Sequence, residues 1–332
     1  MNKLRRKTIL LVLLLIIIGG NPGYSLDRQA AQDAAQDATL NAAQDLWQSI
    51  VLSSDTDKIV GLIIDLGSLG KGNQEVVENI NNYLMELNNL FISGNMVDYS
   101  IVSACITALM ELGDSSSYPV LFSVLIADYP EVIAFEAFGA LDLISGNLHR
   151  FLLGVMETKP SAEKFVALKT GIDGRQLTVS ERGQLAELAL ELSITTAGDD
   201  ADLIAMRYAA VTALTELGWK RANALAIRHY YRTQADFMQG TVSKDRFIEA
   251  ILCLGAVGDS DAALALVLQL GLINARTERT GIFDSEITMA IIRALGNIGD
   301  NAAFDHLLNA SYLSYDEDIT SAATEAIARL KW

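Results

Sequence analysis

Small and aliphatic residues recur at helical spacing along this chain, and most of these stretches end in Gly, often followed by Asp. Counted back from that Gly, small or aliphatic residues stand at positions −9 or −8, −5, −4 and −1. These offsets trace one stripe of an α-helix. The five copies are ACITALMELGD (104–114), AAVTALTELGW (209–219), EAILCLGAVGD (249–259), AIIRALGNIGD (290–300) and, more loosely, LIIDLGSLGK (62–71).

The closing Gly predicts the end of each helix, because the residue after a helix usually turns left-handed and Gly does so at little cost. Asp114, Asp259 and Asp300 come directly after it, where their carboxylates would accept the free N–H groups of the next helix. A second apolar segment follows each turn. The unit is therefore helix, tight turn, helix.

Equivalent anchor positions occur at residues 70, 113, 145, 218, 258, 299 and 331, and the long gap after 145 holds a degenerate repeat at 163–193. Repetition at this period is typical of solenoids. Prolines are few and no strand-like alternation is present. We therefore predict an all-α fold, one continuous α-solenoid of about six or seven antiparallel helix pairs over residues 55–332.

The pattern A-x-x-A-L-x-x-L/I-G-D followed by a short apolar helix resembles the HEAT repeat family, in particular the short HEAT-like repeats of phycobilisome lyases. The resemblance covers roughly residues 55–332 and is strongest at 98–128 and 200–332. Members of that family are mostly scaffolds that bind other proteins along a curved surface. The resemblance therefore implies an interaction role, whereas periodicity alone indicates only stacked helix pairs.

The N-terminus has the pattern of a secretory signal peptide. Basic residues precede an apolar run from Ile9 to Ile18, and Gly23 and Ser25 occupy the −3 and −1 positions of a cleavage site before Leu26. The apolar run is short for a membrane span, which needs roughly 20 residues. We predict a signal peptide over 1–25 and export to the periplasm or outside the cell; an uncleaved N-terminal anchor is the alternative.

Residues 26–54 are rich in Ala, Gln and Asp and repeat the unit Ala-Ala-Gln-Asp. Ala and Gln favour helix, but large apolar residues are nearly missing before Leu40. We predict a helical lead-in whose packing begins near Leu46 and Trp47.

The chain is acidic, with a net charge of −16. Residues 1–25 hold four of the 25 basic residues and none of the 41 acidic ones, so the remaining chain would carry −20. Such a polyanion is repelled by phosphate backbones and anionic membranes, which makes nucleic acid a poor candidate partner. The acidic excess would suit a basic protein partner, or it serves solubility alone.

Cys105 and Cys253 lie on apolar faces several repeats apart. A disulfide is conceivable in an exported protein, but repeats of a solenoid contact only their neighbours. We favour two separate buried thiols.

The ionisable residues indicate no cofactor, metal or catalytic site. His149, His229 and His306 are interpreted as polar-face residues, because no His-Glu dipeptide supplies convergent metal ligands. Acidic clusters at 199–202, 259–261 and 316–318 precede predicted helices, so we favour helix capping over calcium binding. Motifs for a serine nucleophile or a phosphate loop are missing.

One aromatic and basic segment stands out in this acidic chain, and such residues are enriched at interface hot spots. Its aromatic side chains could instead pack into the next repeat. The candidate contact residues are Trp219, Lys220, Arg221, Arg228, Tyr230, Tyr231 and Arg232.

The sequence favours an exported, non-catalytic protein–protein interaction scaffold or assembly factor at the bacterial cell envelope. The alternatives are a metal-dependent enzyme and a small-ligand binder built on the same solenoid.

Overall fold

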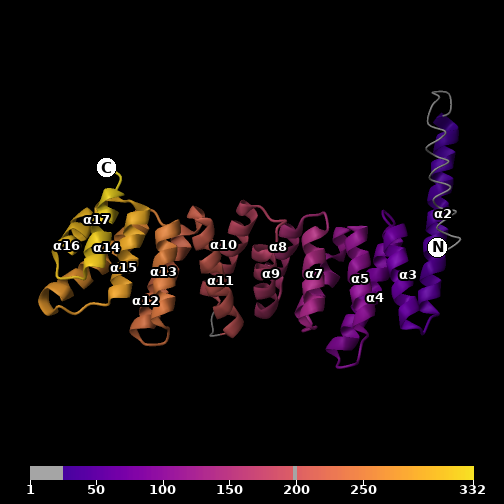
Figure 1. Cartoon of the computed structure of the whole chain (residues 1–332), viewed down its shortest axis with the longest axis horizontal. Coiled ribbons are helices and arrows are strands. Elements are labelled where there is room, and N and C mark those ends of the chain that lie inside the picture. The colour runs from indigo at the N-terminus through magenta and orange to yellow at the C-terminus, as the bar shows by residue number, and fades with distance from the viewer. Residues whose placement is uncertain (1–24, 197–199) are drawn as a thin grey trace. The chain divides into compact units, whose positions relative to one another are not determined.

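The computed structural model describes residues 25–196 and 200–332, with side chains from residue 38 onward. The predicted signal peptide lies, but for its last residue, outside the described residues. The helices group into two compact units, which divide after Leu148 (Figure 1).

The first unit contains six α-helices within its described residues. They are α2 (Ser25–Val51), α3 (Thr56–Leu69), α4 (Gln74–Ile92), α5 (Tyr99–Leu112), α6 (Tyr118–Ile126) and α7 (Glu131–Leu143). Helices α3, α5 and α7 pack side by side as row A, and α2, α4 and α6 form row B beside them.

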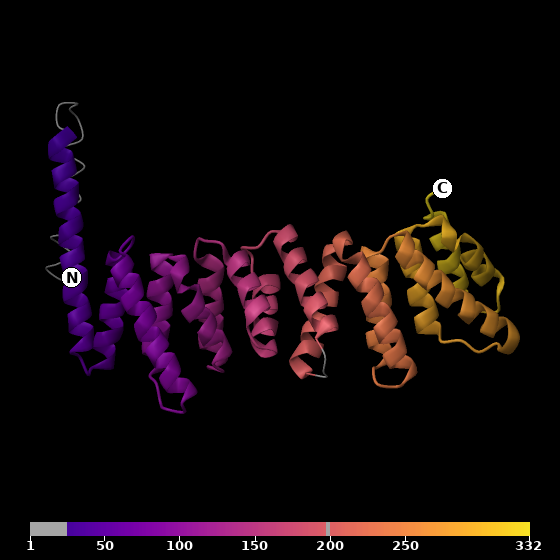
Figure 2. The ribbon, with the colours of Figure 1, turned by 180° about the vertical axis from the view of Figure 1, so that it is seen from behind.

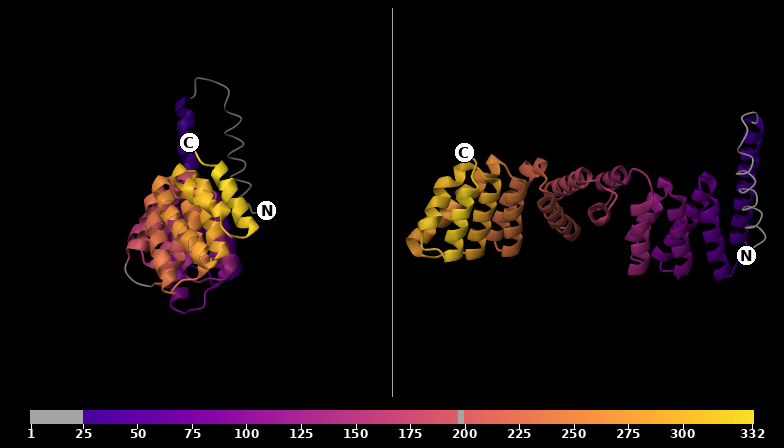
Figure 3. Two further views of the ribbon diagram at one scale, coloured as in Figure 1. Left: turned by 90° about the vertical axis from the view of Figure 1, so that its left-hand side faces the viewer. Right: turned by 45° about the horizontal axis from the view of Figure 1, so that its top comes forward.

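The second unit has the same alternation within itself, and its rows are named in the same way. Row A contains α9 (Ser161–Asp173), α11 (Ala201–Leu217), α13 (Lys244–Val257), α15 (Ser285–Ile298) and α17 (Glu317–Ala328). Row B contains α10 (Val179–Thr195), α12 (Asn223–Met238), α14 (Ser260–Thr280) and α16 (Phe304–Tyr312). The unit begins with α8 (Leu148–Thr158), whose first residue, Leu148, is the last of the first unit. The orange and yellow helices at the C-terminal end of this unit lie side by side in the right-hand view of Figure 3.

The described residues contain no strand, only an isolated bridge between Asp300 and Lys331. The prediction of an all-α architecture made of helix pairs is therefore confirmed for the described chain. The degenerate repeat predicted at 163–193 is present as α9 and α10. Whether residues 55–332 form one continuous domain stays a prediction.

The predicted lead-in is the helix α2, and its C-terminal half packs on the repeats. Ala43 and Ile50 are buried, and the ring of Trp47 lies edge-on to Tyr83 of α4, with centroids 6.0 Å apart. Packing begins close to the predicted position.

The predicted helix ends are confirmed at all five closing glycines, but the left-handed turn occurs at only three of them, since Gly70, with φ −85°, and Gly258 are not left-handed. Gly113, Gly218 and Gly299 have φ of 71°, 58° and 73° and are left-handed. Gly258 has φ −71° and ψ 161°, an extended backbone. Gly is needed there for space, because a Cβ at Gly258 would lie 2.3 Å from the Leu254 carbonyl oxygen.

Aspartate capping is also largely confirmed. The carboxylates of Asp114, Asp259 and Asp300 accept hydrogen bonds from the N–H groups of Ser116, Asp261 and Ala302. At Asp114 and Asp300 the capped element is a short 3-10 turn, Ser115–Ser117 or Asn301–Ala303, that leads into the second helix.

The capping prediction also covers the acidic clusters at 199–202 and 316–318. Asp200 caps α11 by accepting the Asp202 N–H, whereas Asp316 occupies the cap position of α17 without a side-chain hydrogen bond. Asp199 lies outside the described residues.

Some neighbouring row A helices meet through close contacts between Gly and Ala. A Cβ at Gly67 of α3 would lie 2.8 Å from the Ala108 Cα of α5, and one at Gly255 of α13 would lie 2.8 Å from the Ala294 Cα of α15. Both glycines stand three residues before the closing Gly, and both alanines stand five residues before the closing Gly of the next repeat. The repeat therefore fixes how closely its neighbour approaches.

Replacing Gly255 with Ala is expected to lower the free energy of unfolding by about 1–2 kcal/mol, because overpacking against the Ala294 backbone exceeds the gain in helix propensity. The matched change Gly154→Ala in α8, where a Cβ meets nothing within 4 Å, should raise stability or leave it unchanged. Urea unfolding followed by circular dichroism measures both. Equal effects of the two variants would contradict the close-approach argument.

Candidate functional site

The predicted contact segment runs from Trp219 through the short 3-10 turn Lys220–Ala222 into α12. Trp219 itself is bound to the preceding repeat. Its Nε1 donates a hydrogen bond to the Glu187 carboxylate of α10 at 2.8 Å, and its ring covers Gly183, where a Cβ would lie 2.4 Å from the ring. The indole therefore links α10 to the repeat that follows it.

The basic residues beside Trp219 also bind neighbouring repeats. The Arg221 guanidinium lies 5.8 Å from the Trp219 ring centroid, and its Nε is 3.6 Å from the Glu187 carboxylate. Lys220 Nζ donates to the Gly258 carbonyl oxygen at 3.2 Å, just past the end of α13. The dipole of α13 stabilises the Lys220 cation at its C-terminus, whereas Arg221 is held by its ion pair with Glu187 of α10.

The rest of the segment divides between core and surface. Tyr230 is fully buried and stacks on Phe247 with centroids 5.8 Å apart, so its assignment to a contact surface is corrected. Arg232 donates to the Ile194 carbonyl oxygen at 3.2 Å. Arg228 and Tyr231 remain exposed on the outer face of α12, and for them the contact surface stays a prediction.

His229 is not a polar-face residue as predicted, because it is fully buried between α11 and α12. Its Nδ1 lies 3.5 Å from the Thr233 hydroxyl, and the Tyr208 ring meets it edge-on. Arg207 lies on the neighbouring helix α11 and donates to the Ser193 carbonyl oxygen at 2.7 Å. Burial, then the guanidiniums of Arg207 and Arg232, lowers the pKa of His229 to about 3.

The other two histidines are half-buried. His149 Nδ1 lies 4.0 Å from the Glu181 carboxylate, and the His306 ring packs on Gly271. The described residues contain no cluster of three or more His, Cys, Asp or Glu side chains arranged to hold a metal ion.

Cys105 and Cys253 are free and buried, as predicted. Burial raises the pKa of the Cys105 thiol to about 12 and that of the Cys253 thiol to about 11. Neither thiol is a reactive thiolate near neutral pH, so both act as small apolar side chains.

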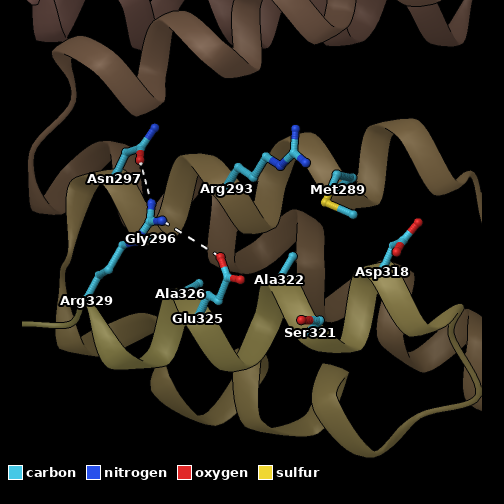
Figure 4. Close-up of a pocket in the computed structure, with 10 residues that line it drawn as sticks. All are labelled: Met289, Arg293, Gly296, Asn297, Asp318, Ser321, Ala322, Glu325, Ala326 and Arg329. Atoms are coloured by element: carbon cyan, nitrogen blue, oxygen red, sulfur yellow. Dashed lines mark hydrogen bonds and ion pairs between the residues drawn. The ribbon is translucent and has the colours of Figure 1, made fainter.

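A groove that the sequence did not indicate lies between α15 and α17 (Figure 4). It has a volume of about 510 Å³. Contact between Gly296 and Ala326 brings the two helices together beneath it, since a Cβ at Gly296 would lie 3.0 Å from the Ala326 Cβ. The lining residues are Met289, Arg293, Gly296, Asn297, Asp318, Ser321, Ala322, Glu325, Ala326 and Arg329.

The two arginines of the groove differ in their pairing. Arg329 lies 3.9 Å from the Glu325 carboxylate and donates to the Asn297 side-chain oxygen at 3.4 Å. Arg293 is exposed and has no hydrogen bond or ion pair within the described chain, and it projects from α15 away from Glu325 (Figure 4). An exposed guanidinium that has no ion pair can bind a carboxylate of a ligand.

A sequence model described as the PBS lyase HEAT-like repeat matches residues 289–311, which cover most of α15, the turn after it and most of α16. The matched segment contributes Met289, Arg293, Gly296 and Asn297 to the groove. No curated protein shows significant similarity to the chain. Among the described helices, none combines the length and apolar character that a membrane span needs.

The buried His229 makes stability depend on pH. Its pKa is about 3 in the folded chain against an ordinary value of 6.5, so below about pH 6.5 the unfolded chain binds a proton that the folded chain does not. We expect stability to fall as the pH falls from 6.5 towards 3, by at most about 1.4 kcal/mol per pH unit from this group.

Urea unfolding of the wild-type chain and of His229→Gln between pH 7 and pH 4 measures this contribution. The variant should lose less stability on acidification than the wild type. Parallel pH profiles would show that His229 is not the group responsible.

Proposed function

We propose that this HEAT-like repeat protein is a non-catalytic protein-interaction scaffold that holds a carboxylate-bearing segment of a partner in the groove between α15 and α17. HEAT-like repeats commonly mediate protein interactions, and the groove is built by row A helices of successive repeats. The proposal rests mainly on one observation, the exposed Arg293 with no ion pair in the described chain.

The charge around Arg293 favours an acidic side chain over a basic one. Arg329 is already paired with Glu325, so the groove can add a carboxylate at Arg293 without displacing an existing ion pair. Asp318 lies near the other end of the groove and would repel a second acidic side chain of the ligand. This arrangement suits an extended segment with one acidic residue flanked by uncharged ones.

A small anionic ligand is a second candidate. The volume of about 510 Å³ falls in the range of small-molecule sites, roughly 300–1,000 Å³. Such sites are mostly lined by apolar and aromatic side chains, whereas Arg, Asn, Ser, Asp and Glu line much of this groove. The composition of the lining therefore favours a peptide segment.

We further propose that the protein acts at the bacterial cell envelope after export. Support comes from the sequence of residues 1–25, where a basic start, an apolar run and small residues follow one another as in signal peptides. An acidic, exported scaffold would act as an assembly factor for other envelope proteins.

Affinity capture from native envelope extract tests the interaction site. We expect a dominant partner whose recovery falls at least tenfold with Arg293→Glu, because the reversed charge would repel the partner carboxylate. The matched variant Arg228→Glu changes the net charge equally on the outer face of α12 and should retain the partner. Loss with Arg228→Glu and retention with Arg293→Glu would move the site to α12 and refute the groove.

Mass spectrometry of the N-terminus of the protein isolated from the envelope fraction tests export. The proposal predicts a mature N-terminus at Leu26. An intact N-terminus on protein recovered from the cytoplasm would contradict it.

A further inference from the structure

Helix α14 of the second unit carries an exposed line of residues that no contact of the described chain explains. Its members recur at i, i+3, i+7, i+11, i+14 and i+18, which follows one face of the helix over about five turns. The line consists of Asp261, Leu264, Leu268, Leu272, Ala275 and Arg279.

The leucines of this line face outward between the neighbouring row B helices. Leu264, Leu268 and Leu272 are 50%, 67% and 68% exposed. The two flanks of α14 are occupied, since Gln269 accepts a hydrogen bond from Gln234 of α12 at 2.7 Å and Asn274 donates to the His306 carbonyl oxygen of α16 at 2.9 Å. Figure 2 gives the opposite view of these helices.

The two ends of the line carry opposite charges. Asp261 stands in the first turn of α14 and Arg279 in the last turn, and both are exposed. Within the described residues neither side chain forms an ion pair, and the Arg279 Nε donates only to the Ala275 carbonyl oxygen of its own helix. An acidic end, an apolar middle and a basic end therefore follow one another on one face.

We propose that this face binds the same face of a second copy of the chain, with the two α14 helices antiparallel around a two-fold axis between Leu268 and Leu272. Antiparallel pairing places Leu268 of one copy against Leu272 of the other, and Arg279 against Asp261. By symmetry each contact occurs twice. The surface is complementary to itself, which is the condition for an isologous dimer.

This order of charges favours a second copy over an unrelated partner. A basic partner would be repelled by Arg279, and an acidic partner would be repelled by Asp261. The antiparallel copy instead brings an opposite charge to each of the two residues. The line advances in steps of three and four residues, so ridges at i±3 of one copy can pack into grooves at i±4 of the other. The charged ends meet when the helices cross at a shallow angle of about 20°.

The neighbouring helices can enlarge the contact to the size of a stable interface, which buries roughly 1,200–2,000 Å² in total. Tyr231 of α12 and Tyr312 of α16 are 47% and 82% exposed and flank the leucines in row B. The proposed groove lies on row A helices, so the dimer leaves it open to a partner. Dimerisation and partner capture are therefore independent of each other.

Sedimentation velocity of the full chain over a concentration series tests the dimer. We expect a monomer–dimer equilibrium whose Kd rises at least tenfold with Leu268→Glu, because two buried carboxylates would face the partner leucines. Leu143→Glu in α7, an equally exposed leucine of the first unit, is the matched control and should leave Kd unchanged. A monomeric wild type, or equal effects of the two variants, would overturn the proposal.

Charge exchange tests the pairing itself. Asp261→Arg and Arg279→Asp should each raise Kd, by roughly threefold to tenfold for two exposed ion pairs. An equimolar mixture of the two single variants should form a heterodimer near wild-type affinity, since each end then meets an opposite charge. Failure of the mixture to recover would refute the antiparallel register.

Discussion

Close approach of neighbouring row A helices is the constraint on which the rest of the structure depends. Gly67 meets Ala108, Gly255 meets Ala294 and Gly296 meets Ala326, all at equivalent positions of the repeat. Contacts of this kind bring helix backbones close together and leave little space for side chains between them. Between α11 and α13 the same positions hold Thr215 and Cys253, whose side chains contact each other instead.

The same contact shapes the candidate site. Gly296 and Ala326 bring α15 and α17 together beneath the groove, and the longer side chains on either side form its walls. Arg293 projects from one wall because it stands on the exposed side of α15, away from the Gly and Ala stripe. Packing within row A therefore creates a surface that a partner segment could occupy without any change in the repeat.

The periodic features were predictable because they depend on local rules. The residues of the apolar stripe, the turn and the helix cap recur from repeat to repeat, so their roles follow from the local sequence without knowledge of tertiary contacts. The burial of His229 could not be predicted, because it depends on packing against the neighbouring helix α11. For Tyr230 the sequence left a contact surface and packing into the next repeat open, and its stacking on Phe247 of α13 decides for packing. The extended backbone at Gly258 goes with crowding by Ala262 and Ile298, which the repeat pattern alone does not reveal. The groove could not be predicted either, because the sequence does not distinguish Arg293 from any other solvent-exposed arginine.

Hydrogen exchange of the chain with and without its captured partner, at fixed chain concentration, tests the central claim most directly. If a partner segment occupies the groove, amides of α15 and α17 should exchange more slowly in the complex, with little change in the first unit. Protection confined to α12 and α14, or to helices of the first unit, would contradict the assignment of the groove as the partner site.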